Sequence, residues 1–215
     1  MTLRILALSL AGSALAWAGL IDTPVAGGVE TFNSRTGCGY CFTTGPVVLP
    51  SGVTFTAGAA STNSGQGAVL GTGVYGLGGN GNWSTPYYAG IDSYFGWMTF
   101  ELPSLVSSVS AFMNYLPGDS GATILALSAG STVLEQYSLD LTLPISTPSA
   151  TDAGAWRGIQ RSSADIKAFQ ILGNYAVVDT LTFGPAVPDA PEPSTTALLA
   201  GAMLLLARVG RRRAA

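Results

Sequence analysis

The 215-residue sequence contains no histidine, and charged residues make up only 10% of it. Without histidine, Ser-His-Asp and Cys-His nucleophilic systems and His-ligated zinc sites are excluded, together with the commonest general base. Two carboxylates flanking a sugar would still suffice for glycoside hydrolysis, but the acidic residues are scattered singly along the chain. We therefore predict a protein that is not an enzyme, with a secreted glycan-active enzyme as the alternative.

Basic residues are also scarce, and most of them lie near the two ends of the chain. Between Gly19 and Pro193 only four basic residues face all twelve acidic ones, and four positive minus twelve negative charges gives −8. A segment this acidic lacks the positive surface that nucleic acid or anionic lipid requires. Nucleic acid is therefore excluded as a partner.

Residues 1–18 have the pattern of a signal peptide. Arg4 supplies the positive start, residues 5–15 are apolar apart from small residues, and Ala16-Trp17-Ala18 matches the small-x-small cleavage pattern. The apolar run is too short for a stable membrane span, and a buried N-terminal helix is the alternative. We expect signal peptidase to cut after Ala18, which makes Gly19 the first residue of an exported protein.

The C-terminal 31 residues combine three features in a fixed order. A proline-rich linker, residues 185–193, precedes a hydrophobic helix and an arginine-rich tail within residues 194–215. Prolines keep the linker extended and accessible, and the apolar run is shorter than the roughly 20 residues of a comfortable membrane span. The arginines halt translocation by staying on the cytoplasmic side; they are Arg208, Arg211, Arg212 and Arg213.

The segment 187–215 resembles the PEP-CTERM sorting signal, in which Pro191, Glu192 and Pro193 form the recognised triplet. The resemblance implies processing by an exosortase, a membrane-embedded cysteine transpeptidase of Gram-negative bacteria, which cuts near the triplet. The protein would sit transiently in the inner membrane through its C-terminal tail, and then reach the cell surface or the extracellular matrix. The alternative is a plain membrane-anchored envelope protein whose tail stays uncut.

Between the two ends, hydrophobic residues recur with a period of two, which is typical of strands. Such runs occupy residues 97–102, 109–115, 122–129, 132–141, 156–161, 165–172 and 175–183, and turn residues separate them. Strands at this spacing predict an all-β fold, a single jelly-roll-like β-sandwich over residues 19–184. Residues 58–82 are glycine-rich, which indicates a loop or thin strands at a sheet edge.

Residues 94–183 also resemble, in outline, the sandwich domains that precede PEP-CTERM tails and the jelly rolls of carbohydrate-binding modules. This resemblance implies a structural or adhesive role in an exopolysaccharide layer, with extracellular polysaccharide as a partner. Aromatic rings stack on the apolar faces of sugars, and Trp83, Tyr87 and Tyr88 lie among turn residues where such contacts are expected. Phe95 and Trp97 are expected in the core instead.

Two further features bear on the chemistry of the domain. Cys38 and Cys41 are the only cysteines, and a local disulfide is the simplest expectation in an oxidising compartment, with redox activity or metal binding as alternatives. By strand parity Asp179 shares a face with Val177 and Leu181, so its carboxylate needs hydrogen bonds, an arginine or a calcium ion. No other cofactor is expected.

Overall fold

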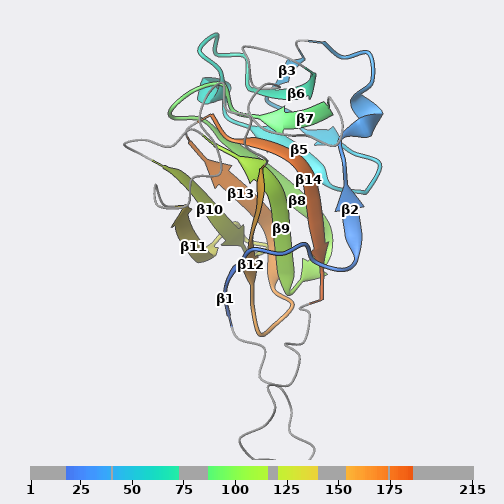
Figure 1. Cartoon of the computed structure of the whole chain (residues 1–215), viewed down its shortest axis with the longest axis vertical. Helices are drawn as coiled ribbons and strands as arrows, with labels where there is room; N and C mark the ends of the chain where they lie inside the picture. Colours follow the sequence, from blue (N-terminus) through green and yellow to red (C-terminus); the bar gives the residue numbers. More distant parts are fainter. Residues whose placement is uncertain are drawn as a thin grey trace, which may run out of the picture. The chain divides into compact units, whose positions relative to one another are not determined.

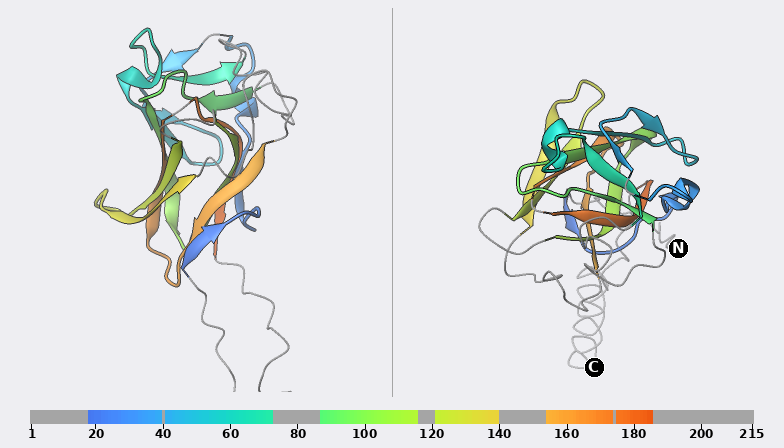
Figure 2. Two further views of the ribbon diagram at one scale, coloured as in Figure 1. Left: turned by 60° about the vertical axis from the view of Figure 1, so that its left-hand side comes forward. Right: turned by 90° about the horizontal axis from the view of Figure 1, so that it is seen from above.

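The computed structural model describes residues 18–39, 41–72, 87–115, 121–139, 154–173 and 175–185 of the chain. These residues form two antiparallel sheets that face each other around one main core (Figure 1), and Figure 2 shows the two layers from the side. The all-β sandwich expected from the period-two runs is thereby confirmed.

The first sheet has eight strands and the second has six. Strands of the first sheet lie in the order β1 (Gly19–Ile21), β12 (Ala155–Gln160), β9 (Ser108–Asn114), β14 (Val177–Gly184), β7 (Tyr87–Gly90), β6 (Ala68–Thr72) and β3 (Phe42–Thr43), and β2 (Gly28–Glu30) also pairs with β14. Strands of the second sheet lie in the order β11 (Val133–Leu139), β10 (Ala122–Leu127), β13 (Ile166–Leu172), β8 (Trp97–Val106), β5 (Thr54–Ala57) and β4 (Val47–Val48). Two short 3-10 helices, η1 (Asn33–Arg35) and η2 (Ala59–Ser61), lie between strands.

The sequence pattern explains which side chains enter the core. In β8, Met98, Phe100 and Leu102 are buried between the sheets, and alternate residues of the strand point outward. Phe100 packs against Phe55 of β5, with the ring centroids 5.6 Å apart. The chain alternates between the sheets along β8, β9, β10, β12, β13 and β14, which gives the jelly-roll character.

One end of the sandwich is closed by the β7–β6–β3 part of the first sheet. These strands run across the end at which β8 begins (Figure 1), and Leu70 and Ala89 join the main core from there. Within the glycine-rich region, η2 and β6 are formed, and residues 73–82 lie outside the described part of the chain.

Among the described residues, no helix has the length and apolar character needed to cross a membrane. The predicted signal peptide up to Trp17, the predicted linker beyond Pro185 and the apolar C-terminal segment fall outside those residues. Export and processing therefore stay predictions from the sequence.

Candidate functional site

Three aromatic side chains, Tyr94, Phe95 and Tyr175, gather where the β7–β8 loop meets the β13–β14 loop. Trp97 follows them at the start of β8, and we call these four residues the aromatic surface. Phe95 is 84% exposed, Tyr94 51% and Trp97 37%. The ring of Tyr175 meets Tyr94 edge-on at 4.9 Å, and the ring of Phe95 lies 6.3 Å from Tyr94. Single exposed hydrophobic side chains are common on protein surfaces, but clusters of them are unusual and mark interaction sites.

Buried serines hold the β7–β8 loop in place. The Ser61 hydroxyl accepts a hydrogen bond from the backbone N–H of Trp97 at 3.0 Å and donates one to the Trp97 carbonyl at 2.6 Å. The Ser93 hydroxyl donates to the Ala60 carbonyl at 2.6 Å and accepts from the N–H of Phe95 at 3.3 Å. The backbone that presents the aromatic rings is therefore fixed on both sides of Phe95.

The two loops are also tied to each other. The N–H of Gly173 donates to the carbonyl of Gly96 at 2.7 Å, and the N–H of Tyr175 donates to the carbonyl of Ser93 at 3.1 Å. Tyr175 adopts a left-handed backbone with φ of 53°, a conformation that costs a non-glycine residue roughly 1–2 kcal/mol. Backbone strain of this kind clusters at functional sites, and here it occurs at a residue whose ring is packed against Tyr94.

Gly96 explains how the loop packs so closely against η2. A Cβ atom at this position would meet Cγ2 of Ile91 and Cα of Ser61 at 2.5 Å, so no larger residue fits without moving the loop. This packing adds to the hydrogen bonds in limiting the motion of Phe95.

A buried carboxylate lies at the base of the same loop. Asp92 is only 5% exposed, and its N–H donates to the Ser61 carbonyl at 2.7 Å. Burial raises the pKa of the Asp92 carboxyl from 3.8 to about 6. The β7–β8 loop therefore has at its base a carboxyl group, that of Asp92, which changes charge near pH 6.

The aromatic residues singled out from the sequence are Trp83, Tyr87 and Tyr88, and the expectation for Tyr88 is wrong. Tyr88 is fully buried, because β7 is an interior strand between β6 and β14 and the ring joins Val69 and Val177 in a small separate cluster. Tyr87 is half-buried against the main core. Trp83 lies outside the described residues.

The core placement of Phe95 and Trp97 is also wrong. Phe95 belongs to a loop, and β8 begins at Trp97. Successive side chains of a strand point to opposite faces, so Met98 faces the core and the Trp97 indole faces outward. The sequence carried a signal for this, since Asp92-Ser93 before the pair Tyr94-Phe95 and Gly96 after it are turn residues.

Asp179 is buried, at 2% exposed, but its surroundings differ from the parity expectation. The β14–β9 register shifts between Val178 and Thr180, so Asp179 occupies a bulge. Val178 and Leu181 consequently both face the main core, whereas Val177 faces the opposite side. The hydroxyl of Thr180 donates to Oδ2 of Asp179 at 3.3 Å. Calcium binding stays a prediction; within the described residues no three His, Cys, Asp or Glu side chains are grouped to hold a metal ion.

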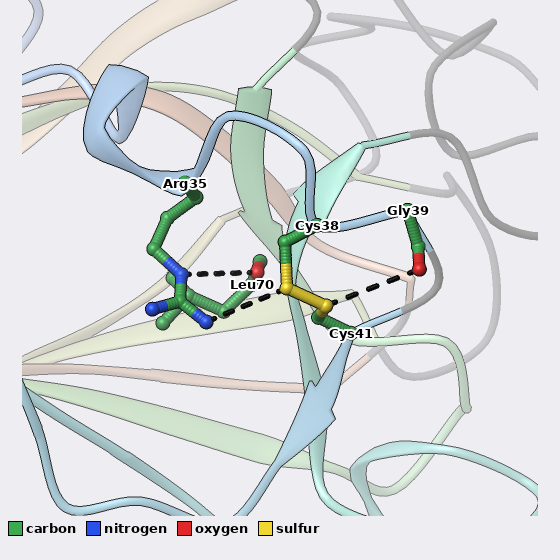
Figure 3. The surroundings of a disulfide bond; sticks show 5 residues. All are labelled: Arg35, Cys38, Gly39, Cys41 and Leu70. Atoms are coloured by element: carbon green, nitrogen blue, oxygen red, sulfur yellow. Dashed lines mark hydrogen bonds between the residues drawn. A yellow bond between two sulfur atoms is a disulfide. The ribbon is translucent and has the colours of Figure 1, made fainter.

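Cys38 and Cys41 form the expected disulfide (Figure 3), and no helix begins at Cys38. The Arg35 guanidinium lies beside it, with Nη2 3.6 Å from Sγ of Cys38 and Nε donating to the Leu70 carbonyl at 3.5 Å. The backbone of the short loop is tied to β6, because the N–H of Leu70 donates to the Cys41 carbonyl at 2.8 Å and that of Thr72 to the Cys38 carbonyl at 3.1 Å. The disulfide thus fastens the β3 edge of the first sheet.

The residues predicted to form a sorting triplet, Pro191, Glu192 and Pro193, and the tail arginines Arg208, Arg211, Arg212 and Arg213 fall outside the described residues.

No family model matches the sequence, and neither does any curated protein. Two solved structures align with part of the chain. The lectin-binding domain of a lectinolysin mutant in complex with Lewis b is 13% identical, with a TM-score of 0.35, and the alignment covers 55% of this chain and 92% of that one. The lectin domain of lectinolysin in complex with Lewis B antigen is 10% identical, with a TM-score of 0.35, over 60% of this chain and 97% of that one. Similarity at this level carries no argument about what this chain binds.

Proposed function

We propose that this protein is a non-catalytic component of the cell surface or extracellular matrix that contacts polysaccharide through the aromatic surface. We further propose that signal peptidase and an exosortase deliver it there. The first proposal rests on the domain, and the second rests on the two ends of the sequence.

The exposure of Phe95 on a fixed loop carries the proposal of polysaccharide contact. A ring that is 84% exposed loses hydrophobic stabilisation in the isolated protein, yet buried serines hold its backbone in place. Preorganised aromatic side chains lower the entropy cost of binding, and flat rings match the C–H faces of pyranose sugars. Tyr94 beside Phe95 and Tyr175 against Tyr94 widen the aromatic contact.

The opposite ends of the sequence support the proposed delivery. A positive start followed by an apolar run and Ala16-Trp17-Ala18 suits signal peptidase. The Pro191-Glu192-Pro193 triplet, the short apolar run and the terminal arginines match the order of a PEP-CTERM signal. An excess of acidic residues in the domain suits a soluble surface protein that does not adhere to anionic lipid.

Polysaccharide contact is tested with the mature protein recovered from its native host. Affinity electrophoresis through gels containing the host's exopolysaccharide measures the dissociation constant. Loss of one stacked ring corresponds to about 1 kcal/mol, so Phe95→Ala is expected to weaken binding about fivefold. Val48→Ala is the matched control, because Val48 is 73% exposed on the β4 edge strand and outside the aromatic surface. Equal mobility of the wild-type protein with and without polysaccharide would refute the proposal.

Delivery is tested by intact-mass analysis in hosts with and without the exosortase. We expect a form that begins at Gly19 and ends near Pro193, and we expect it to disappear when the exosortase is deleted. A form that retains Arg211, Arg212 and Arg213 in both strains would instead establish a plain membrane anchor.

A further inference from the structure

The Cys38–Cys41 disulfide lies in an accessible part of the surface. Both cysteines are partly exposed, and the glycines beside Cys38, Gly37 and Gly39, are exposed. Among the described residues, nothing lies within 4 Å of a Cβ placed on Gly37, and for Gly39 the nearest atom is Oγ1 of Thr72 at 3.8 Å. Thiol–disulfide exchange proceeds by attack of a thiolate on a disulfide sulfur, so access of this kind is its first requirement.

The two sulfurs have different electrostatic neighbours. Nη2 of Arg35 donates to Sγ of Cys38 at 3.6 Å, whereas Sγ of Cys41 lies 3.9 Å from the carbonyl oxygen of Gly39 (Figure 3). A cation beside a thiol lowers its pKa, and the negative end of a carbonyl dipole has the opposite effect. In the reduced protein the thiolate therefore forms at Cys38. The guanidinium supplies the positive charge that a helix N-terminus supplies to other reactive cysteines.

The position of the guanidinium is fixed by the backbone on both sides. The N–H of Cys38 donates to the Arg35 carbonyl at 3.2 Å, so both residues belong to one tight turn. Nε of Arg35 donates to the carbonyl of Leu70 on β6 at 3.5 Å. The positive charge therefore stays beside Cys38 when the S–S bond is broken.

The loop that carries the cysteines is also held on β6 without the disulfide. The N–H of Leu70 donates to the Cys41 carbonyl at 2.8 Å, that of Thr72 donates to the Cys38 carbonyl at 3.1 Å, and Gly39 forms a parallel bridge with Thr72. These contacts involve backbone atoms alone, so reduction leaves the two thiols adjacent and ready to close again. A disulfide that spans so few residues also constrains the unfolded chain little, which makes stabilisation a minor part of its role.

We propose that Cys38 and Cys41 form a reversible thiol–disulfide exchange site whose partner is a thiol. The partner thiolate attacks Sγ of Cys41, the S–S bond breaks, and Cys38 leaves as a thiolate beside Arg35. A second thiolate attacks the partner sulfur of the mixed disulfide and releases Cys41. Two partner thiols are thereby oxidised to a disulfide, and the protein dithiol takes up the two electrons and the two protons that they lose.

The first test measures the pKa of each thiol in the reduced mature protein. Iodoacetamide is added at a series of pH values, and mass spectrometry follows the alkylation of each cysteine. We expect Cys38 to react with a pKa about one unit below the ordinary value of about 8.5, and Cys41 to react with a pKa at or above that value. Arg35→Gln should return the pKa of Cys38 to its ordinary value, which lowers its thiolate fraction at pH 7 roughly eightfold.

Two further variants separate the charge of Arg35 from its packing. Arg35→Lys keeps the positive charge and should keep the pKa of Cys38 lowered. Lys167→Gln removes a positive charge from β13 of the second sheet and should leave both cysteines unchanged. Equal pH profiles for the two cysteines in the wild-type protein, or a profile that Arg35→Gln leaves unchanged, would overturn the proposal.

The second test starts from the oxidised wild-type protein and needs no variant. The protein is incubated in buffers with increasing ratios of reduced to oxidised glutathione, and free thiols are trapped and counted by mass. We expect the disulfide to open in excess reduced glutathione and to close again with oxidised glutathione, while circular dichroism shows an unchanged fold. A disulfide that resists glutathione in the folded protein, as structural disulfides do, would overturn the proposal.

A second probe identifies the source of the partner thiol. Oxidation of glutathione but not of reduced, unfolded ribonuclease A would assign the site to small thiols, and oxidation of both would include protein thiols. None of these measurements involves polysaccharide, so failure of this proposal is distinguishable from failure of the proposed function.

Discussion

Replacing Asp92 by asparagine removes a carboxyl group whose pKa is raised by burial. The ionised form of Asp92 is penalised because the residue is 5% exposed at the base of the aromatic loop, and its pKa moves from 3.8 to about 6. A folded-state pKa above the unfolded value means that the folded protein binds the proton more tightly. Stability contributed by protonated Asp92 is therefore present below about pH 4 and is lost as the pH rises through about 6.

The magnitude follows from the size of that change. A pKa difference of one unit corresponds to 1.36 kcal/mol, so the change to about 6 has an upper limit of about 3 kcal/mol. Residual contact of the carboxyl group with solvent lowers this to about 1–2 kcal/mol. For a domain of this size, 1 kcal/mol shifts the melting temperature by roughly 2–4 °C. We expect Asp92→Asn to melt about 2–8 °C higher than the wild-type protein at pH 7.5, and to melt at nearly the same temperature at pH 4.

Asp165 provides a control of opposite sign. Arg161 donates to both of its oxygens, at 2.6 Å and 2.9 Å, and this holds the pKa of the Asp165 carboxyl below its usual range. The stability that ionised Asp165 contributes to the folded protein is present above the unfolded pKa and is lost as the pH falls. Asp165→Asn should therefore destabilise the protein at pH 7.5. Thermal unfolding at several pH values measures both variants. An Asp92→Asn variant with the wild-type slope between pH 4 and 7.5 would refute this reasoning.

Three further substitutions follow from the structure. Phe169→Ala empties a fully buried position in the main core, and chemical denaturation should report a loss of about 3–5 kcal/mol, whereas a loss below about 1 kcal/mol would contradict the packing. Replacing both Cys38 and Cys41 by serine opens a loop of only four residues, so the entropic model predicts a loss of about 2 kcal/mol, measured under oxidising conditions. Ser61→Ala removes both hydrogen bonds to the backbone of Trp97, and it should cost about 1–3 kcal/mol and also weaken polysaccharide binding; unchanged binding would mean that the loop needs no such support.

The second half of the fold follows closely from the sequence because its strands alternate cleanly. The run 97–102 predicted β8 with Met98 and Phe100 inside, and the runs up to residue 183 correspond to β9 to β14 within a few residues. In β8 the hydrophobic period alone determines which face is buried, whereas β14 is buried on both faces. The short strands β2 to β6 carry too few alternating residues for the same inference, and β2 and β5 also pair with strands far along the chain, β14 and β8.

The site could not be located in the same way, because exposure depends on the neighbours of a strand. The turn residues near Tyr88 in the sequence suggested a surface position. However, β6 and β14 flank its strand β7, and its ring is buried. Asp179 changes the parity of β14 by forming a bulge, which no period in the sequence reveals. Arg157 occupies a core-facing position of β12 that a hydrophobic pattern would assign to an apolar residue.

The central claim is that polysaccharide contacts the aromatic surface, and NMR titration of the isotope-labelled mature protein tests it most directly. Oligosaccharides prepared from the host's exopolysaccharide are added while the backbone amide signals are followed. We expect the shifts to concentrate in residues 92–97 and in Tyr175 and Ala176, the two loops that carry the exposed rings. Shifts confined to other parts of the sandwich, or no shifts at saturating oligosaccharide, would contradict the claim.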